Sequence, residues 1–196
     1  MSAWRDAATA RRQSPQPAGL PEPRRQLAML VACPYLYVGP TARTGMGVFT
    51  ARPVAAGAVI VADEDGTLQR RALPLAAALA QGWDLAHDLF QIGHDLFLPP
   101  RGCFDDLFNH SCEPSGGWRL TQEGARFLAI RDLAAGEEIT YDYSCHLVSP
   151  GERMVCACGT ASCRAVIGPF AGLPRPLQAR YRGLGVVSPA LAAPPA

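Results

Sequence analysis

Nine consecutive residues, LFNHSCEPS at 107–115, carry an amide, an imidazole, hydroxyls, a thiol and a carboxylate. Side chains of these types can form a nucleophilic dyad, half of a metal site, or a polar loop without a chemical role. A dyad of His110 and Cys112 is a weak interpretation, because nucleophilic catalysis also needs a third group that orients the base, and the sequence offers no evident one.

Three further thiols lie close together near the end of the chain. Cys156, Cys158 and Cys163 have the spacing C-x-C-x4-C in a segment with little apolar content. Such a segment cannot fold by burial alone, and close cysteines in an intracellular protein usually bind metal. Structural zinc takes four ligands, so a fourth must come from elsewhere. The spacing does not choose among six candidates: Cys33, Cys103, Cys112, Cys145, His110 and His146.

The composition excludes several functions. The formal net charge of +1 over 196 residues does not provide the concentrated basic surface that nucleic acid demands, so we expect no direct binding to duplexes. The chain contains no lysine, which excludes a P-loop, a Schiff base and any internal amine nucleophile.

The cysteines and the apolar runs indicate a compartment. Seven cysteines is an odd number and no apolar signal segment precedes them, so we expect reduced thiols in an intracellular protein, cytoplasmic or, in a eukaryote, nuclear. The longest apolar run, LAMLVACPYLYVG, is interrupted by Pro34 and is too short to span a bilayer. We therefore expect no membrane association.

Short strands must position these side chains. From Leu27 onward, β-rich runs alternate with turns, which predicts a mostly β fold. The runs are LAMLVA, YLYVG, GVFTA, AVIVAD, GWRLT, ARFLAIRD and EEITYDY. Trp118 to Leu120 and Arg126 to Ile130 are expected to pair as a hairpin. Only residues 73–90 have the alanine and leucine content of a helical insert.

One pattern occurs twice, as ARPVAAGAVI at 51–60 and as IRDLAAGEEI at 130–139. It aligns Val54 with Leu133 and Gly57 with Gly136. A common turn pattern that recurred is one explanation. The other explanation is that the two copies form equivalent β-arms that flank one site.

Four signals in a fixed order carry a family resemblance: GMGVF, FNHSC, GEEITYDY and the C-x-C-x4-C segment. Together they resemble the SET-domain lysine methyltransferases that have a post-SET zinc segment. The resemblance covers roughly residues 30 to 168. It implies small curved sheets around a pseudoknot, in which the chain bearing FNHSC passes beneath the segment bearing TYDY.

The resemblance and the composition together predict the domain organisation. The resemblance implies the SET domain over 27–148 and a zinc-bound post-SET segment over 149–168. Residues 1–26 mix Arg, Pro, Ala and Gly without periodicity and are expected to form a disordered tail. Residues 169–196 are a C-terminal extension that the resemblance leaves unassigned. The extension can form one short helix around Pro176 to Arg182.

The first roles that the resemblance assigns concern S-adenosylmethionine and zinc. Gly45, Met46 and Gly47 would contact the amino acid end of the cofactor through the main chain, because glycine allows a close approach. Asn109 would hold its methionine portion, and His110 its adenine, largely through the main chain. Cys112 would donate the fourth thiolate to the one structural zinc ion, which Cys156, Cys158 and Cys163 would also bind.

The resemblance assigns the chemistry to tyrosines rather than to carboxylates. Tyr143 matches the catalytic tyrosine and Tyr141 the aromatic switch position, and in a strand both side chains point to one face. The implied reaction transfers a methyl group to the ε-amine of lysine in a basic protein or peptide. A tyrosine at the switch position favours mono- or dimethylation. Glu137 and Glu138 are expected on a solvated turn, with Asp142 facing away from the channel.

Several positions depart from the family pattern. The family commonly has Arg in place of Asp106, Asn in place of Ser115 and Gly in place of Ala165, and often an active-site Tyr where this chain has VADEDG. An acidic mouth at Asp63 to Asp65 would suit a basic substrate. These departures keep two alternatives open: a SET-fold binding module with little or no turnover, and a methyltransferase for a non-protein amine.

Overall fold

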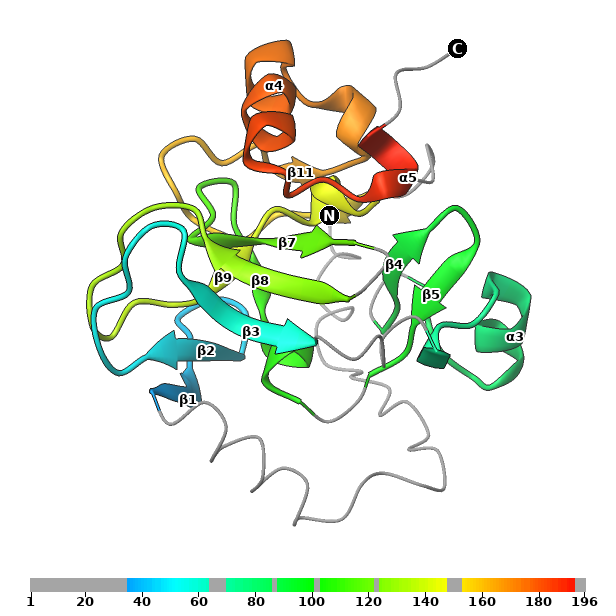
Figure 1. Ribbon diagram of the computed structural model, residues 1–196, viewed down its shortest axis with the longest axis horizontal. Helices are drawn as coiled ribbons and strands as arrows, with labels where there is room; N and C mark the ends of the chain where they lie inside the picture. Colours follow the sequence, from blue (N-terminus) through cyan, green and yellow to red (C-terminus); the bar gives the residue numbers. More distant parts are fainter. Residues whose placement is uncertain are drawn as a thin grey trace, which may run out of the picture.

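The molecule is built from several small sheets rather than one large one (Figure 1). The computed structural model describes residues 35–63, 70–85, 88–100, 103–121, 124–147 and 153–192. The strands are β1 Leu36–Pro40, β2 Met46–Thr50, β3 Val59–Asp63, β4 Phe90–Gly93, β5 Leu96–Leu98, β6 Asn109–His110, β7 Gly116–Leu120, β8 Ala125–Ala129, β9 Thr140–Tyr141, β10 Met154–Val155 and β11 Val166–Ile167. The helices are α3 Leu75–Ala80, α4 Arg175–Leu184, α5 Pro189–Ala192 and the 3-10 turns η1 Phe104–Leu107, η2 Tyr143–Cys145 and η3 Phe170–Gly172.

The central sheet has the order β3-β8-β7 and is antiparallel. The predicted hairpin is confirmed, since Trp118 pairs with Phe127 and Leu120 with Ala125. The pairs β1-β2, β4-β5 and β10-β11 are antiparallel, whereas β6 and β9 are parallel. Helices α4 and α5 lie on the β7 side of the central sheet, and β1-β2 lie on the other side (Figure 1). The mostly β prediction is confirmed.

Two apolar clusters hold these parts together. The larger one lies under the central sheet, where Phe108, Trp118 and Phe127 pack ring against ring with centroids 4.6 to 6.4 Å apart. The smaller one places Tyr181 of α4 with Phe170 and Cys145. The C-terminal extension therefore packs onto the domain through a core of its own.

The repeated sequence is also a structural repeat. Val54 and Leu133 exchange two backbone hydrogen bonds, with N···O distances of 3.0 and 2.8 Å. Gly57 and Gly136 have nearly the same left-handed φ, +83° and +81°, and each donates its N–H to a carbonyl at the start of the opposite arm. The interpretation as two equivalent arms is therefore correct. One arm follows β2 and the other leads into β9, so both join strands that carry predicted site residues.

The helical prediction for 73–90 is wrong over most of its length. Helix α3 stops at Ala80, because Gly82 adopts a φ of +89° that no right-handed helix contains. Phe90 instead begins the hairpin β4-β5, which the sequence did not lead us to expect. Leu73 pairs with Phe97 and ties α3 to this hairpin.

The last predicted strand is shorter than expected, whereas the predicted C-terminal helix is present. The last predicted strand is only β9, and the chain turns at Tyr143 into η2 because the Asp142 carboxylate accepts the N–H of Ser144 at 3.1 Å. The C-terminal helix is confirmed as α4, which ends at Gly185 with a φ of +67°. The predicted tail over 1–26, the strand LAMLVA and the last three residues of VADEDG lie outside the described residues.

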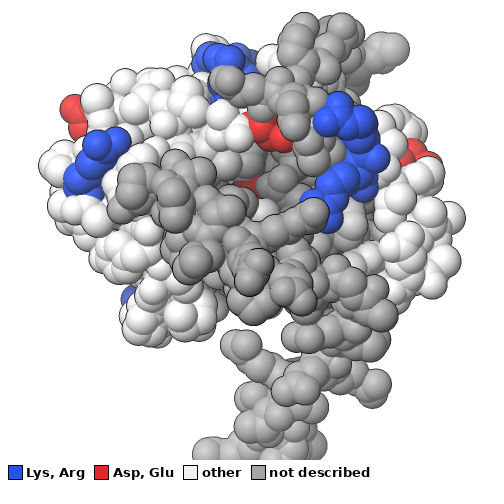
Figure 2. Space-filling model, turned by 60° about the horizontal axis from the view of Figure 1, so that its bottom comes forward, with Lys and Arg blue, Asp and Glu red and all other residues white. Residues whose placement is uncertain are grey.

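Charged side chains are mixed on the surface of the described residues. On the face in Figure 2, arginine side chains gather in separate groups and acidic side chains lie among them. The expectation that duplex nucleic acid is not a partner stays a prediction. None of the described helices has both the length and the apolar character needed to cross a membrane.

Candidate active site and metal centre

The parallel pair β6-β9 brings the two richest motifs together. Asn109 lies opposite Thr140 and His110 opposite Tyr141, and the N–H of Ser111 donates to the carbonyl of Tyr141 at 3.0 Å. Parallel strands 31 residues apart in sequence require the intervening chain to cross over and return. This pairing is the contact that the predicted pseudoknot requires.

The predicted cofactor residues Gly45, Met46, Gly47 and Asn109 lie together. The Asn109 amide donates to the Met46 carbonyl at 2.9 Å and to Glu138 Oε1 at 2.7 Å. Since these two bonds use both amide hydrogens, Oδ1 of Asn109 is left as a hydrogen-bond acceptor. Gly45 has a φ of +88°, which a non-glycine residue adopts only with strain. The group can therefore present backbone groups and one amide oxygen to a ligand.

Glu138 was missed by the sequence analysis. It is half-buried, lies opposite Phe49 of β2 and holds the Asn109 amide, so the prediction of a solvated turn is wrong for this residue. The internal repeat contained the signal that would have found it, because Glu138 takes the place that Val59 has in the first copy. Val59 begins strand β3, and Glu138 correspondingly forms an isolated β-bridge with Phe49 rather than lying on a free turn.

A substitution at Gly47 would test the proposed cofactor site around Asn109. A Cβ at position 47 would contact Glu138 Oε1 and lie 2.7 Å from Thr41 Cγ2 and 3.0 Å from Asn109 Nδ2. We expect Gly47→Ala to weaken S-adenosylmethionine binding by about tenfold or more, because the Asn109 amide must move and lose a hydrogen bond. Isothermal titration calorimetry measures the change. Gly183→Ala is the matched control, since its Cβ would meet no atom within 4 Å, and equal affinities in the two variants would contradict the assignment.

The His110 side chain supports other residues of the site. Its Nδ1 accepts the backbone N–H of Tyr143 at 3.2 Å, and its Nε2 lies 3.4 Å from Cys112 Sγ. Burial lowers the pKa of His110 to about 4, so the ring is neutral near pH 7 and its one proton is on Nε2, facing the sulfur. The ring thus links Tyr143 to Cys112 and has no nitrogen left to act as a base. A main-chain contact of His110 with the cofactor stays a prediction.

Tyr143 and Tyr141 lie ring against ring, with centroids 4.6 Å apart. The Tyr143 hydroxyl donates to the Phe108 carbonyl at 2.8 Å. Burial, with a smaller effect of the Glu138 charge, raises the pKa of Tyr143 to about 12, so the phenol keeps its proton at neutral pH. Because that proton goes to Phe108, the Tyr143 oxygen is left to accept a hydrogen bond.

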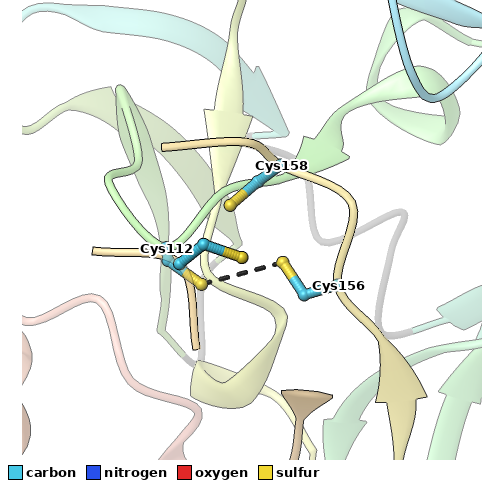
Figure 3. A group of neighbouring side chains, drawn as sticks. Cys112, Cys156 and Cys158 are labelled. Carbon is cyan, nitrogen blue, oxygen red and sulfur yellow. Dashed lines mark hydrogen bonds between the residues drawn. The ribbon is translucent and has the colours of Figure 1, made fainter. Parts of the chain in front are cut away.

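Four sulfur atoms meet at the predicted metal site. The Sγ atoms of Cys112, Cys156, Cys158 and Cys163 all lie within 4.8 Å of one another, and three of them point to a common centre in Figure 3. A tetrahedron with zinc–sulfur bonds of about 2.3 Å places its sulfurs about 3.8 Å apart. The Cys112 and Cys156 sulfurs are 3.8 Å apart. The donor set therefore fits zinc, and of the five candidate fourth ligands that the structure describes it brings the Cys112 thiol into the cluster, whereas Cys33 lies outside the described residues.

Hydrogen-bond donors around the sulfurs support thiolate ligands. The backbone N–H of Arg164 points at Cys112 Sγ at 3.4 Å, and that of Ala165 at Cys163 Sγ at 3.5 Å. Together with Nε2 of His110, these donors stabilise negative charge on sulfur, as the surroundings of a metal site do. Cys145 and His146 are buried elsewhere, and the His146 ring lies tilted against Phe90 with the ring centroids 4.6 Å apart.

Three departures from the family pattern have local explanations. Asp106 accepts the N–H of Cys103 at 2.9 Å and caps η1. Ser115 is fully buried and binds Thr140 of β9, whose N–H donates to Ser115 Oγ at 2.7 Å. Ala165 has a φ of +61°, the left-handed conformation that glycine adopts without strain. The first two residues are therefore integrated into the fold, and the third is strained.

Ala165→Gly is expected to stabilise the zinc-loaded protein by about 0.5–1 kcal/mol, because it relieves the left-handed strain at some cost in chain entropy. Chemical denaturation measures the change. Ala179→Gly, at an exposed position of α4, should instead destabilise by about 1 kcal/mol. A loss of stability in both variants would show that position 165 is not strained.

The chain resembles known proteins in sequence and in structure. The SET domain family model matches residues 45–144. Histone-lysine N-methyltransferase ash1 of Drosophila melanogaster is 32% identical over 145 residues, which are 71% of this chain and 6% of that protein. A histone-lysine N-methyltransferase of Cryptococcus neoformans, H3 lysine-4 specific, is 39% identical over 83 residues, 39% of this chain and 6% of its own length. The chain thus spans a small part of these relatives.

Solved structures support the fold. The methyltransferase domain of human histone-lysine N-methyltransferase SETMAR superposes with a TM-score of 0.52 at 20% identity, covering 68% of this chain and 58% of that one. KRYPTONITE in complex with mCHG DNA and SAH gives a TM-score of 0.52 at 21% identity, covering 67% and 28%. At these identities the likeness concerns the fold.

Proposed function

This chain belongs to the SET-domain family, and from that premise we propose that it is an S-adenosylmethionine-dependent methyltransferase acting on the ε-amine of lysine in a protein. The observation that carries the proposal is the position of the Tyr143 hydroxyl. The Tyr143 side chain is a neutral phenol, and its hydroxyl hydrogen is directed to the carbonyl of Phe108, the residue before Asn109. Its oxygen is thus an acceptor beside the proposed cofactor residues.

The proposed reaction needs little acid–base chemistry from the protein. S-adenosylmethionine, when bound, supplies a methyl group on a positively charged sulfur. Tyr143 Oη and the Phe108 carbonyl can attract the polarised methyl hydrogens, and Tyr143 Oη can accept an N–H of an unprotonated lysine amine. Gly45, Met46 and Asn109 would bind the cofactor. In-line geometry and exclusion of water are the remaining demands, and these depend on packing.

The aromatic surroundings of Tyr141 bear on the product. Its ring contacts Phe90 edge-on at 6.0 Å and Phe127 at 6.3 Å. Burial raises the pKa of Tyr141, so its hydroxyl also stays protonated. A hydroxyl at this position takes space and can hold an amine or a water, and we infer mono- or dimethylation rather than trimethylation.

The names of two sequence relatives support a substrate class. Both are named as histone-lysine N-methyltransferases, and one as specific for lysine 4 of histone H3. We propose a lysine-bearing basic segment, such as a histone tail, as substrate. An intracellular location, nuclear in a eukaryote, belongs to the same proposal.

The direct test is methyl transfer. The zinc-loaded full chain is incubated with radiolabelled S-adenosylmethionine and histone H3, a panel of lysine peptides, and the same peptides with arginine in place of lysine. The expected result is label on lysine peptides alone, with one or two methyl groups by mass spectrometry. Label on the arginine peptides, or none on any protein or peptide, would refute the proposal.

A binding module without turnover is the second candidate, motivated by the substitutions at Asp106 and Ser115. Both residues are integrated into the fold by the bonds described above, which weakens this alternative. Calorimetry separates the two: zinc-loaded protein that does not bind S-adenosylmethionine would favour the binding module. Methylation of a non-protein amine shares every site residue and differs only in the acceptor.

A further inference from the structure

Asp142 is a buried carboxylate between the two tyrosines that takes no part in the proposed chemistry. Its side chain is 1% exposed. Oδ1 accepts bonds from Arg164 Nη2 at 2.8 Å and from the N–H of Ser144 at 3.1 Å, and Oδ2 accepts the Tyr181 hydroxyl at 3.1 Å. A buried charge needs such partners, because removing it from water is costly.

The partners come from three different segments. Arg164 directly follows the zinc ligand Cys163, Ser144 belongs to η2, and Tyr181 belongs to α4 in the C-terminal extension. Asp142 is therefore the point where the catalytic segment, the zinc segment and the C-terminal helix meet. In Figure 1 α4 lies over the β7 side of the central sheet, and Tyr181 of α4 shares an apolar cluster with Cys145 of η2.

The extension is held firmly at this place. Tyr181 is 1% exposed and packs in the smaller core with Phe170 and Cys145. The N–H of Ser188 donates to the Cys145 carbonyl at 2.9 Å, so the chain after α4 also binds η2. Val186 packs directly on Gly117, where a Cβ would lie 2.7 Å from the Val186 Cβ.

These contacts connect Tyr181 to Tyr143 through the Asp142 carboxylate. The Asp142 carboxylate caps η2, the turn that begins at Tyr143, and the turn fixes the direction of the Tyr143 ring. Among the described residues, the Tyr181 hydroxyl is the partner that the structure gives to Oδ2 of Asp142. Without it the carboxylate can rotate toward Arg164 and release the cap.

We propose that Tyr181 is a positioning residue for methyl transfer, which acts through Asp142 and makes the C-terminal extension part of the catalytic unit. The inference deepens the proposed function and, where it concerns turnover, rests on it. Tyr181 touches neither Tyr143 nor the cofactor residues in any contact described here. Its effect should therefore fall on turnover and not on cofactor affinity.

The experiment compares Tyr181→Phe with Tyr35→Phe in the zinc-loaded full chain. Each variant removes one phenol hydroxyl that donates a hydrogen bond, and Tyr35 donates to the Ile60 carbonyl at 3.1 Å, away from Asp142. For Tyr181→Phe we expect amide hydrogen exchange over residues 142–146 to rise about fivefold or more, at unchanged zinc content. We expect kcat to fall about threefold to tenfold, with KM for S-adenosylmethionine within about twofold of wild type. Tyr35→Phe should leave both the hydrogen exchange over residues 142–146 and kcat unchanged.

A second measurement tests whether Tyr181 acts through Asp142. If Tyr181 acts through Asp142, the losses in kcat from Tyr181→Phe and Asp142→Asn should not be additive. Additive losses, or exchange equal to that of Tyr35→Phe, would overturn the inference. A wild-type protein that transfers no methyl group would refute the proposed function instead, and the exchange measurement would still decide whether Tyr181 holds η2.

Discussion

Tyr143→Phe is expected to lower kcat for methyl transfer by about 10²-fold or more, while the affinity for S-adenosylmethionine stays within about twofold. The substitution removes one oxygen and leaves the ring in place beside Tyr141. That oxygen is the proposed acceptor for the amine and the methyl group, and the Phe108 carbonyl alone would remain. Single-turnover kinetics and calorimetry measure the two quantities.

The pH dependence separates positioning from base catalysis by Tyr143. Since burial raises the pKa of Tyr143 to about 12, the phenol stays protonated from pH 7 to 10. The rise in rate over that range should come from the substrate amine, whose ordinary pKa is about 10.4. The variant should therefore show the same profile shape at a lower rate. A rising limb that is lost in Tyr143→Phe would mean that the tyrosine acts as a base.

Cys112→Ser is the second variant for which we expect a large effect. Native mass spectrometry should detect one zinc ion in the wild-type protein and a greatly reduced occupancy in the variant. Binding of structural zinc contributes about 10–16 kcal/mol to folding of small zinc domains, so the free energy of unfolding should fall by several kcal/mol. Because His110 links Cys112 to the Tyr143 backbone, methyl transfer should be lost as well.

Cys145→Ser is the control for this prediction. Cys145 is also a buried thiol close in sequence to the site, but it is not among the four clustered sulfurs. The Cys145→Ser variant should therefore retain zinc at full occupancy. Retention in Cys112→Ser together with loss in Cys145→Ser would reverse the ligand assignment.

The sequence determined the identities of the chemical groups and their local conformations. Cys156, Cys158 and Cys163 are near one another by spacing alone, and the strands around Val48 and Phe127 follow from their β-rich runs. Turn chemistry is equally local, since glycine at positions 57 and 136 is what allows the left-handed turn of each arm. The family motifs also predicted Cys112 as the fourth thiolate, and its sulfur does lie with the other three; the roles of the two tyrosines stay predictions.

Only the tertiary structure decided what each group touches. Glu138 looked like a surface residue until the pairing with β2 placed it against Asn109. Asp142 was expected only to face away from the channel, and its three partners come from residues 144 to 181. These contacts depend on the crossover that makes β6 and β9 parallel and on the return of α4 over the sheet. A local pattern fixes backbone conformation over a few residues, but long-range contacts depend on how the chain closes its loops and buries its apolar faces, which no short stretch of sequence contains.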